Sequence, residues 1–176
     1  MGEITQLPIG AKERDFIAPV PLNANHDVSH FDCGKEPLNS WLRTRAARNE
    51  GRASRTFVVC HRTGPVAGFY SLNTGSVQQA DAPKELARNM PDPIPTLLIG
   101  RLAVDKQYQG QGLGEDLLRD ALARALTVSQ EAGMRAVLVH AIDQDIIPFY
   151  AGYGFKAFPG GSLTLFLPVE HIAAAI

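Results

Sequence analysis

The chain has 176 residues, of which 45% are hydrophobic and 20% are charged, and its formal net charge is −1. This composition is typical of a folded domain with its own core and argues against a disordered chain. No apolar run approaches the ~20 residues that a membrane helix needs, and Met1–Gly10 lacks the pattern of a signal peptide. We therefore expect one domain over residues 1–176, located in the cytoplasm.

The elements of the amino-terminal half are predicted from hydrophobic periodicity and turn residues. In chain order we expect a strand, a helix, the two strands of a hairpin and a short helix: Phe16–Leu22, Leu38–Arg48, Thr56–His61, Val66–Val77 and Pro83–Asn89. The first helix carries Trp41 and Leu42 on one apolar face. Three prolines then exclude regular strand pairing and indicate a loop: Pro91, Pro93 and Pro95.

The carboxyl-terminal half begins with Thr96–Val104, whose sequence TLLIGRLAV is nearly continuous in apolar side chains, as in a buried strand. A long helix, a strand, a short helix and a last strand follow: Leu113–Glu131, Ala136–Ile142, Ile146–Tyr153 and Ser162–Leu167. This order of elements predicts an α/β (α+β) fold with a mixed central β-sheet flanked by helices.

Cysteine and charge patterns add two further expectations. Cys33 and Cys60 are the only cysteines, which predicts two reduced thiols, no disulfide framework and no metal site. Residues 35–62, here called the basic stretch, carry a net charge of +5 and leave −6 to the rest of the chain. Such a field attracts phosphates or acidic protein, although a solvated helix face paired with carboxylates elsewhere explains it equally well.

Three glycines alternate between the end of a buried strand at Val104 and the start of the long helix: Gly110, Gly112 and Gly114. Glycine lets backbone N–H groups approach a ligand closely, and at a helix start these groups favour an anion such as a pyrophosphate. A dinucleotide-binding loop would stand in a first βα unit with an acidic residue ~20 positions later, and a Walker loop would end in Gly-Lys-Ser/Thr. Neither pattern is present, which leaves a pyrophosphate loop or a structural turn.

Two motifs resemble the Gcn5-related N-acetyltransferase (GNAT) superfamily. Gln109-x-x-Gly112-x-Gly114, after a strand ending in Leu-Ala-Val, is similar to its acetyl-CoA signature, and the segment 149–155 is similar to its FYxxxGF element. Within the superfamily, the chain resembles the TacT-like toxins of type II toxin–antitoxin pairs. Five segments carry this resemblance: FDCGKEPLNSWL, RTFVV, VAGFYSLNTGSV, PIPTLLIGRLAVD and AIDQDIIPFYAGYGF.

The resemblance implies a GNAT fold with acetyl-CoA in a splay between central strands. The backbone of one strand segment would pair with the pantetheine arm: Leu102, Ala103 and Val104. The loop would hold the pyrophosphate: Gln109, Gly110, Gln111, Gly112, Leu113 and Gly114. Phe149 would flank the cofactor arm, and Tyr150 would act as general acid to the leaving thiolate, whose sulfur gains negative charge.

Two positions depart from the superfamily pattern, because Asp143 stands where many members have Asn and Pro148 where they have Ala. Aspartate does not donate as an amide does, so no cofactor contact is expected from Asp143. Pro148 early in a short helix is tolerable. A general base is not evident; His140 at a strand end could serve, and the resembling toxins are thought to need none.

The resemblance implies a translation-blocking toxin that acetylates the α-amine of aminoacyl-tRNA. A ribbon-helix-helix antitoxin would neutralise it, the complex would bind operator DNA as a repressor, and the toxin would be a homodimer. The expected tRNA-binding residues lie in the basic stretch: Arg43, Arg45, Arg48, Arg52 and Arg55. A small-molecule amine or protein N-acetyltransferase and a non-catalytic CoA-binding regulator are the alternatives. The tRNA, the amino acid and the antitoxin stay open.

Overall fold

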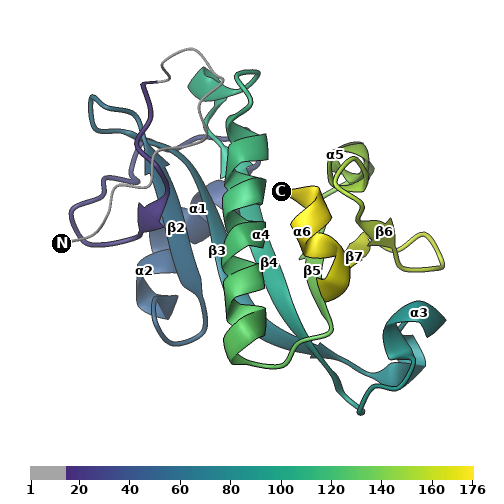
Figure 1. Ribbon diagram of the computed structural model, residues 1–176. Coiled ribbons are helices and arrows are strands. Elements are labelled where there is room, and N and C mark those ends of the chain that lie inside the picture. Colours follow the sequence, from purple (N-terminus) through teal and green to yellow (C-terminus); the bar gives the residue numbers. More distant parts are fainter. Residues whose placement is uncertain (1–14) are drawn as a thin grey trace. The chain divides into compact units, whose positions relative to one another are not determined.

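The computed structural model describes residues 15–176 (Figure 1). Seven strands form a sheet in the order β1-β2-β3-β4-β5-β7-β6. Their bounds are Val20–Pro21 (β1), Arg55–Cys60 (β2), Val66–Val77 (β3), Ile94–Val104 (β4), Ala136–His140 (β5), Lys156–Ala157 (β6) and Thr164–Pro168 (β7). β4 and β5 run parallel, whereas the pairs β1–β2, β5–β7 and β6–β7 are antiparallel, so the predicted mixed sheet is confirmed.

Six α-helices accompany the sheet in the described part of the chain: Glu36–Thr44 (α1), Ala46–Asn49 (α2), Lys84–Ala87 (α3), Leu113–Glu131 (α4), Ile147–Ala151 (α5) and Ile172–Ala175 (α6). Four short 3-10 helices join these elements: Gln79–Asp81 (η1), Lys106–Tyr108 (η2), Gln144–Ile146 (η3) and Val169–His171 (η4). Across residues 15–176, none of the helices has the length and apolarity required to cross a membrane.

The described chain divides into two compact units. The first comprises residues up to Ser71 together with Leu102–Leu117, and the second comprises Leu72–Arg101 together with Leu118–Ile176. β3, β4 and α4 each contribute residues to both units. The expectation of one domain over residues 1–176 stays a prediction.

The core of the first unit forms where α1 packs on β2 and β3. Trp41 stacks on Phe69 with a centroid distance of 5.9 Å, and Phe31 meets the same ring edge-on at 5.4 Å. Ala46 and Val58 are completely buried in this cluster. The apolar face predicted for the first helix is therefore the face that holds this unit together.

The second unit has its own core between the sheet and α3. Leu86 of α3 is completely buried in one cluster with Ile94 and Phe166. β5 supplies the middle of the sheet here, because Leu138 pairs with Leu98 on one side and with Phe166 on the other. The first four residues of this strand, Ala136–Val139, are all buried, which agrees with its apolar sequence, and His140 at its end is exposed.

Two strand predictions were wrong in detail. Pro95 was expected in a loop, but β4 begins at Ile94 and includes it, because the Pro95 carbonyl accepts the Arg135 N–H at 2.8 Å and the strand needs only an acceptor at that position. The strand expected over Phe16–Leu22 shrinks to Val20–Pro21, with one isolated bridge between Phe16 and His61.

The helix expected over Leu38–Arg48 is interrupted. α1 and α2 meet at Arg45, whose φ of −117° breaks the helical run without a proline or glycine. Trp41, Leu42 and Ala46 are nevertheless all buried in one cluster, so the predicted apolar face is kept across the break. β6 and α6 were not predicted, since a two-residue strand and a four-residue helix leave too little periodicity to detect.

Candidate active site

The glycine loop connects η2 to α4 within the first unit. Gly110 and Gly112 have φ values of +78° and +79°, a conformation that residues with a side chain rarely adopt. A Cβ added at Gly110 would meet nothing within 4 Å, so space is open beside this backbone. Alternating positive-φ residues form concave arrays of N–H groups, and these residues therefore fit an anionic phosphate group.

The loop ends on a helix long enough to contribute a dipole. α4 has 19 residues, and its predicted bounds, Leu113–Glu131, are confirmed. One of its first hydrogen bonds joins the Asp116 N–H to the Gly112 carbonyl at 3.2 Å. The first N–H groups of a helix lack an intrahelical acceptor, and this is the arrangement that suits an anion.

A close approach between α4 and β3 holds the start of this helix. Leu117 is completely buried, and a Cβ added at Gly68 of β3 would lie 2.9 Å from its Cδ1 atom. The same Cβ would lie 3.1 Å from the Ala103 carbonyl oxygen. Glycine at position 68 therefore suits this close approach, since a larger residue would displace Leu117 and crowd the Ala103 carbonyl.

The end of β4 carries the three residues expected along the pantetheine arm. β5 pairs with β4 over Thr96–Ile99, so this pairing is complete before Leu102, Ala103 and Val104 are reached. Toward β3, the Asp105 N–H donates to the Ala67 carbonyl at 2.8 Å. Whether the backbone of Leu102–Val104 binds a cofactor stays a prediction.

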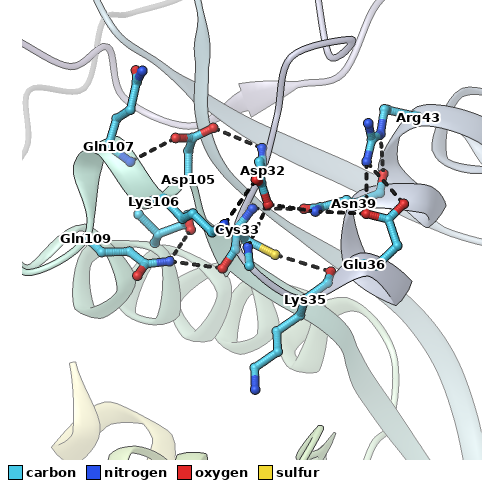
Figure 2. A network of polar contacts seen from close by, with 12 residues as sticks. Asp32, Cys33, Lys35, Glu36, Asn39, Arg43, Asp105, Lys106, Gln107 and Gln109 are labelled. Carbon is cyan, nitrogen blue, oxygen red and sulfur yellow. Dashed lines mark hydrogen bonds and ion pairs between the residues drawn. The ribbon is translucent and has the colours of Figure 1, made fainter.

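The side chain of Gln109, the first residue of the loop motif, forms hydrogen bonds with other residues of the chain. Its Nε2 atom donates to the Val104 carbonyl at 2.9 Å and to the Cys33 carbonyl at 3.1 Å (Figure 2). Because both bonds use the side-chain amide, a phosphate would have to be contacted by the backbone N–H of Gln109. The partner at Cys33 could not be read from the motif, because it lies 76 residues away in the sequence.

Tyr150 lies in the second unit, on α5. Its ring is 6% exposed and lies 5.1 Å from Phe149 and 5.7 Å from Phe155, both in edge-to-face contact. Burial raises the pKa of Tyr150 to about 12, because the phenolate would lose its hydration. The hydroxyl is therefore fully protonated at neutral pH, as a proton donor must be. Phe149 is half-buried and also contacts Tyr153 at 5.7 Å.

The two departures from the superfamily pattern have local explanations. Asp143 caps η3, since its Oδ1 atom accepts the Asp145 N–H at 2.9 Å. Pro148 lies in the first turn of α5, where its missing N–H removes no hydrogen bond. His140, the candidate base, is exposed, and its Nδ1 atom lies 2.9 Å from the Thr164 hydroxyl on the facing strand β7.

The five arginines expected to bind tRNA divide into two groups. Arg43 forms an ion pair with Glu36 at 3.3 Å, and Arg55 forms one with Glu50 at 3.4 Å. The other three are exposed and form no ion pair with residues 15–176: Arg45, Arg48 and Arg52. Arg45 caps the start of α2, Arg48 lies in this helix and Arg52 lies in the turn after it, so these three charges are close together in the sequence.

Cys33 and Cys60 are free and buried, and burial raises the pKa of both thiols. Neither is therefore an activated nucleophile. The residues that the sequence did not single out are Asp32, Asn39 and Asp105, whose hydrogen bonds connect the start of α1 with η2, just ahead of the glycine loop (Figure 2). A buried asparagine inside a helix is the signal that could have pointed to them.

Comparison with known proteins identifies the family. Residues 52–157 match the model of the acetyltransferase (GNAT) domain. A relative from Mycobacterium tuberculosis, named tRNA-acetylating toxin, is 44% identical over 162 residues, which cover 92% of this chain and 97% of the relative. The chain therefore belongs to the GNAT family of acetyltransferases.

Solved structures of the toxin AtaT have the same fold. AtaT complexed with acetyl-methionyl-tRNAfMet has a TM-score of 0.81 and 30% identity, covering 91% of this chain and 98% of that one. A mutant AtaT bound to the C-terminus of the antitoxin AtaR and to acetyl-CoA has a TM-score of 0.78 and 29% identity. The match covers 91% of this chain and 97% of that one. The AtaT–AtaR complex bound to DNA has a TM-score of 0.73 and 30% identity, and the match covers 90% of this chain and 98% of that one.

Proposed function

We propose that this chain is a toxin that transfers the acetyl group of acetyl-CoA to the α-amine of an aminoacyl-tRNA and so blocks translation. The observation that carries the proposal is the 44% identity to a tRNA-acetylating toxin across nearly the whole of both chains. Two features of residues 15–176 agree with it. The loop has positive-φ glycines with open space beside Gly110, and three arginines at and after the start of α2 form no ion pair within this part of the chain. We also propose that the protein acts in the cytoplasm, where aminoacyl-tRNA is used.

The proposed site divides the work among residues of this chain. Acetyl-CoA, when bound, supplies an activated acetyl thioester. The backbone N–H groups from Gln109 to Gly114 would hold its pyrophosphate, and the backbone of Leu102–Val104 would align its arm. Phe149 would flank the arm. The Tyr150 hydroxyl would hold the proton that neutralises the departing sulfur, a role that its raised pKa permits.

No carboxylate of the chain is assigned as general base. The α-amine of an aminoacyl ester is less basic than that of a free amino acid, so much of it is neutral at physiological pH. His140, held against Thr164, or a water molecule would accept the remaining proton. Replacing His140 with alanine distinguishes the two, because a base contributes to the rate and a bystander does not.

We further propose that a ribbon-helix-helix antitoxin neutralises the chain and that the pair binds operator DNA as a repressor, with the toxin as a homodimer. AtaT has been solved with the C-terminus of AtaR and, as the AtaT–AtaR complex, with DNA. By analogy, DNA binding would belong to the complex.

Acetyl transfer to charged tRNA tests the function directly. Purified protein is incubated with labelled acetyl-CoA and total aminoacyl-tRNA, and the ester is then hydrolysed to release the amino acid. We expect N-acetylated amino acid from a subset of tRNAs and none from uncharged tRNA. Label on a polyamine, an aminoglycoside or a protein amine in its place would establish the alternative acetyltransferase. Acetyl-CoA binding without any transfer would establish a non-catalytic regulator.

Reversing Arg45, Arg48 and Arg52 to glutamate should severely weaken tRNA binding. These arginines have no carboxylate partner within residues 15–176, so they can bind the phosphates of tRNA without breaking an ion pair in this part of the chain. Each lost phosphate contact should also flatten the salt dependence of binding by roughly one counterion. Gel shifts and acetylation assays over a salt series measure both effects.

The control for this variant changes the same amount of charge elsewhere. Lys84, Arg88 and Arg119 are exposed and lie outside the basic stretch, so their reversal to glutamate should leave tRNA acetylation close to that of the wild type. Acetyl-CoA affinity should be unchanged in both variants. If the Arg45, Arg48 and Arg52 variant acetylates charged tRNA like the wild type at every salt concentration, the basic stretch is only a solvated face.

A further inference from the structure

A network of polar contacts joins two segments of the first unit that are far apart in the sequence (Figure 2). The first segment runs from Asp32 to Asn39, and the second runs from Asp105 to Gln109. The Asp32 N–H donates to Asp105 Oδ2 at 3.0 Å, and the Lys106 N–H donates to the Asp32 carbonyl at 2.8 Å. Together with the bond from Gln109 to the Cys33 carbonyl, these contacts attach the base of the glycine loop to the segment before α1.

Asn39 is the buried centre of the first segment. It is 2% exposed, and its Oδ1 atom accepts the Cys33 N–H at 2.8 Å. Its Nδ2 atom donates to Asp32 Oδ1 at 3.0 Å and to Glu36 Oε2 at 3.3 Å. The amide thus fixes the backbone of Cys33 from one side, while Gln109 uses the Cys33 carbonyl on the other.

Asp105 has the corresponding place in the second segment. It is 8% exposed, and its Oδ1 atom accepts the Gln107 N–H at 2.9 Å, which caps η2. Its other oxygen holds the Asp32 N–H, so the carboxylate connects both segments. An ion pair of 3.2 Å between Lys106 and Asp32 completes the network, but both side chains are largely exposed and water screens it.

Asp32 is ionised within this network. The Gly34 N–H, the Asn39 amide and Lys106 all hold the pKa of the Asp32 carboxyl below its usual value, the first being the largest cause. Its carboxylate is therefore a charged acceptor at neutral pH, which strengthens the bond from Asn39. Asn39 and Asp105 are the buried members of the network, and removing either side chain leaves a backbone N–H without its partner.

We infer that Asn39, Asp105 and Gln109 are positioning residues for the glycine loop, since their side chains hold its base in the conformation that accepts a pyrophosphate. This inference rests on the proposed binding of acetyl-CoA in that loop. Two glycines with positive φ make the loop flexible in isolation, and a ligand that must order it binds more weakly. The Gln109 amide removes this freedom at the first residue of the loop, and Asn39 keeps its Cys33 acceptor in place.

The test is a double-mutant cycle on acetyl-CoA binding. Gln109→Ala, Asn39→Ala and the double variant are compared by calorimetric Kd for acetyl-CoA and by steady-state kinetics. Each single change should raise both Kd and KM for acetyl-CoA by ~3–10-fold, the equivalent of one or two net hydrogen bonds, and leave kcat nearly unchanged. Because both residues act through Cys33, the double variant should lose no more than the worse single variant.

Two controls keep this test decisive. Ser40→Ala is an exposed change next to Asn39 on α1 and should bind acetyl-CoA like the wild type. If Asn39→Ala fails to fold, Asn39→Leu replaces it, because leucine has nearly the same branched shape and removes both the acceptor for the Cys33 N–H and the donor to Asp32 without adding a charge. Gln109→Ala should fold in any case, since the side chain is exposed.

The outcomes separate this inference from the proposed function. A wild-type protein that binds no acetyl-CoA contradicts the proposed function itself. If the wild type binds acetyl-CoA, and Gln109→Ala binds it equally well or the two single losses add in the double variant, only the positioning role is wrong.

Discussion

Replacing Tyr150 with phenylalanine is expected to lower the rate of acetyl transfer by ~10²–10⁴-fold, the usual contribution of a general acid. The change removes one hydroxyl from a ring that is 6% exposed and packed against Phe149 and Phe155, so the fold should be unaffected. Acetyl-CoA binding should also persist, because only the proton donor is lost. Single-turnover acetylation of charged tRNA and calorimetry with acetyl-CoA measure the two effects separately.

The pH profile supplies a second signature of this residue. Because burial raises the pKa of Tyr150 to about 12, the hydroxyl stays protonated through neutral and mildly alkaline pH. The wild-type rate should therefore show no alkaline decline caused by this group in that range. Tyr153→Phe is the matched control, with the same chemical change three residues further along the chain. Near-normal turnover in Tyr150→Phe together with a large loss in Tyr153→Phe would reassign the acid to Tyr153.

Replacing Gly112 with aspartate is expected to abolish acetyl-CoA binding. Gly112 has a φ of +79°, so any side chain there strains the backbone, and a carboxylate adds negative charge at the position proposed for the pyrophosphate. A ligand present at 100 times its Kd stabilises the folded state by ~2.7 kcal/mol, and this gain should vanish from the variant. Thermal unfolding with and without acetyl-CoA is the measurement.

Gly133→Asp controls for the added charge and bulk. A Cβ at Gly133 would meet nothing within 4 Å, and its φ is not among the positive values, so the variant should fold and keep the full thermal shift. Circular dichroism must show that Gly112→Asp is folded before its shift is interpreted. A folded Gly112→Asp protein with an undiminished shift would remove the pyrophosphate from this loop.

The sequence by itself determined the features that depend on neighbouring residues. The bounds of α4 and β3, Leu113–Glu131 and Val66–Val77, agree with the prediction because each has a strong apolar period bounded by turn residues. The mixed sheet and the GNAT family were also evident from the order of elements and from the two motifs. The positive φ at Gly110 and Gly112 follows from local chemistry, since only glycine adopts it readily.

The tertiary structure alone decided the features that depend on residues distant in the sequence. The helix break at Arg45 has no proline or glycine to signal it, and the strand position of Pro95 comes from a donor 40 residues away, at Arg135. The side chain of Gln109 finds its acceptor at Cys33 because folding brings β4 and the segment before α1 together. No periodicity encodes such a contact, since its free energy appears only once both partners are held in place by the rest of the chain.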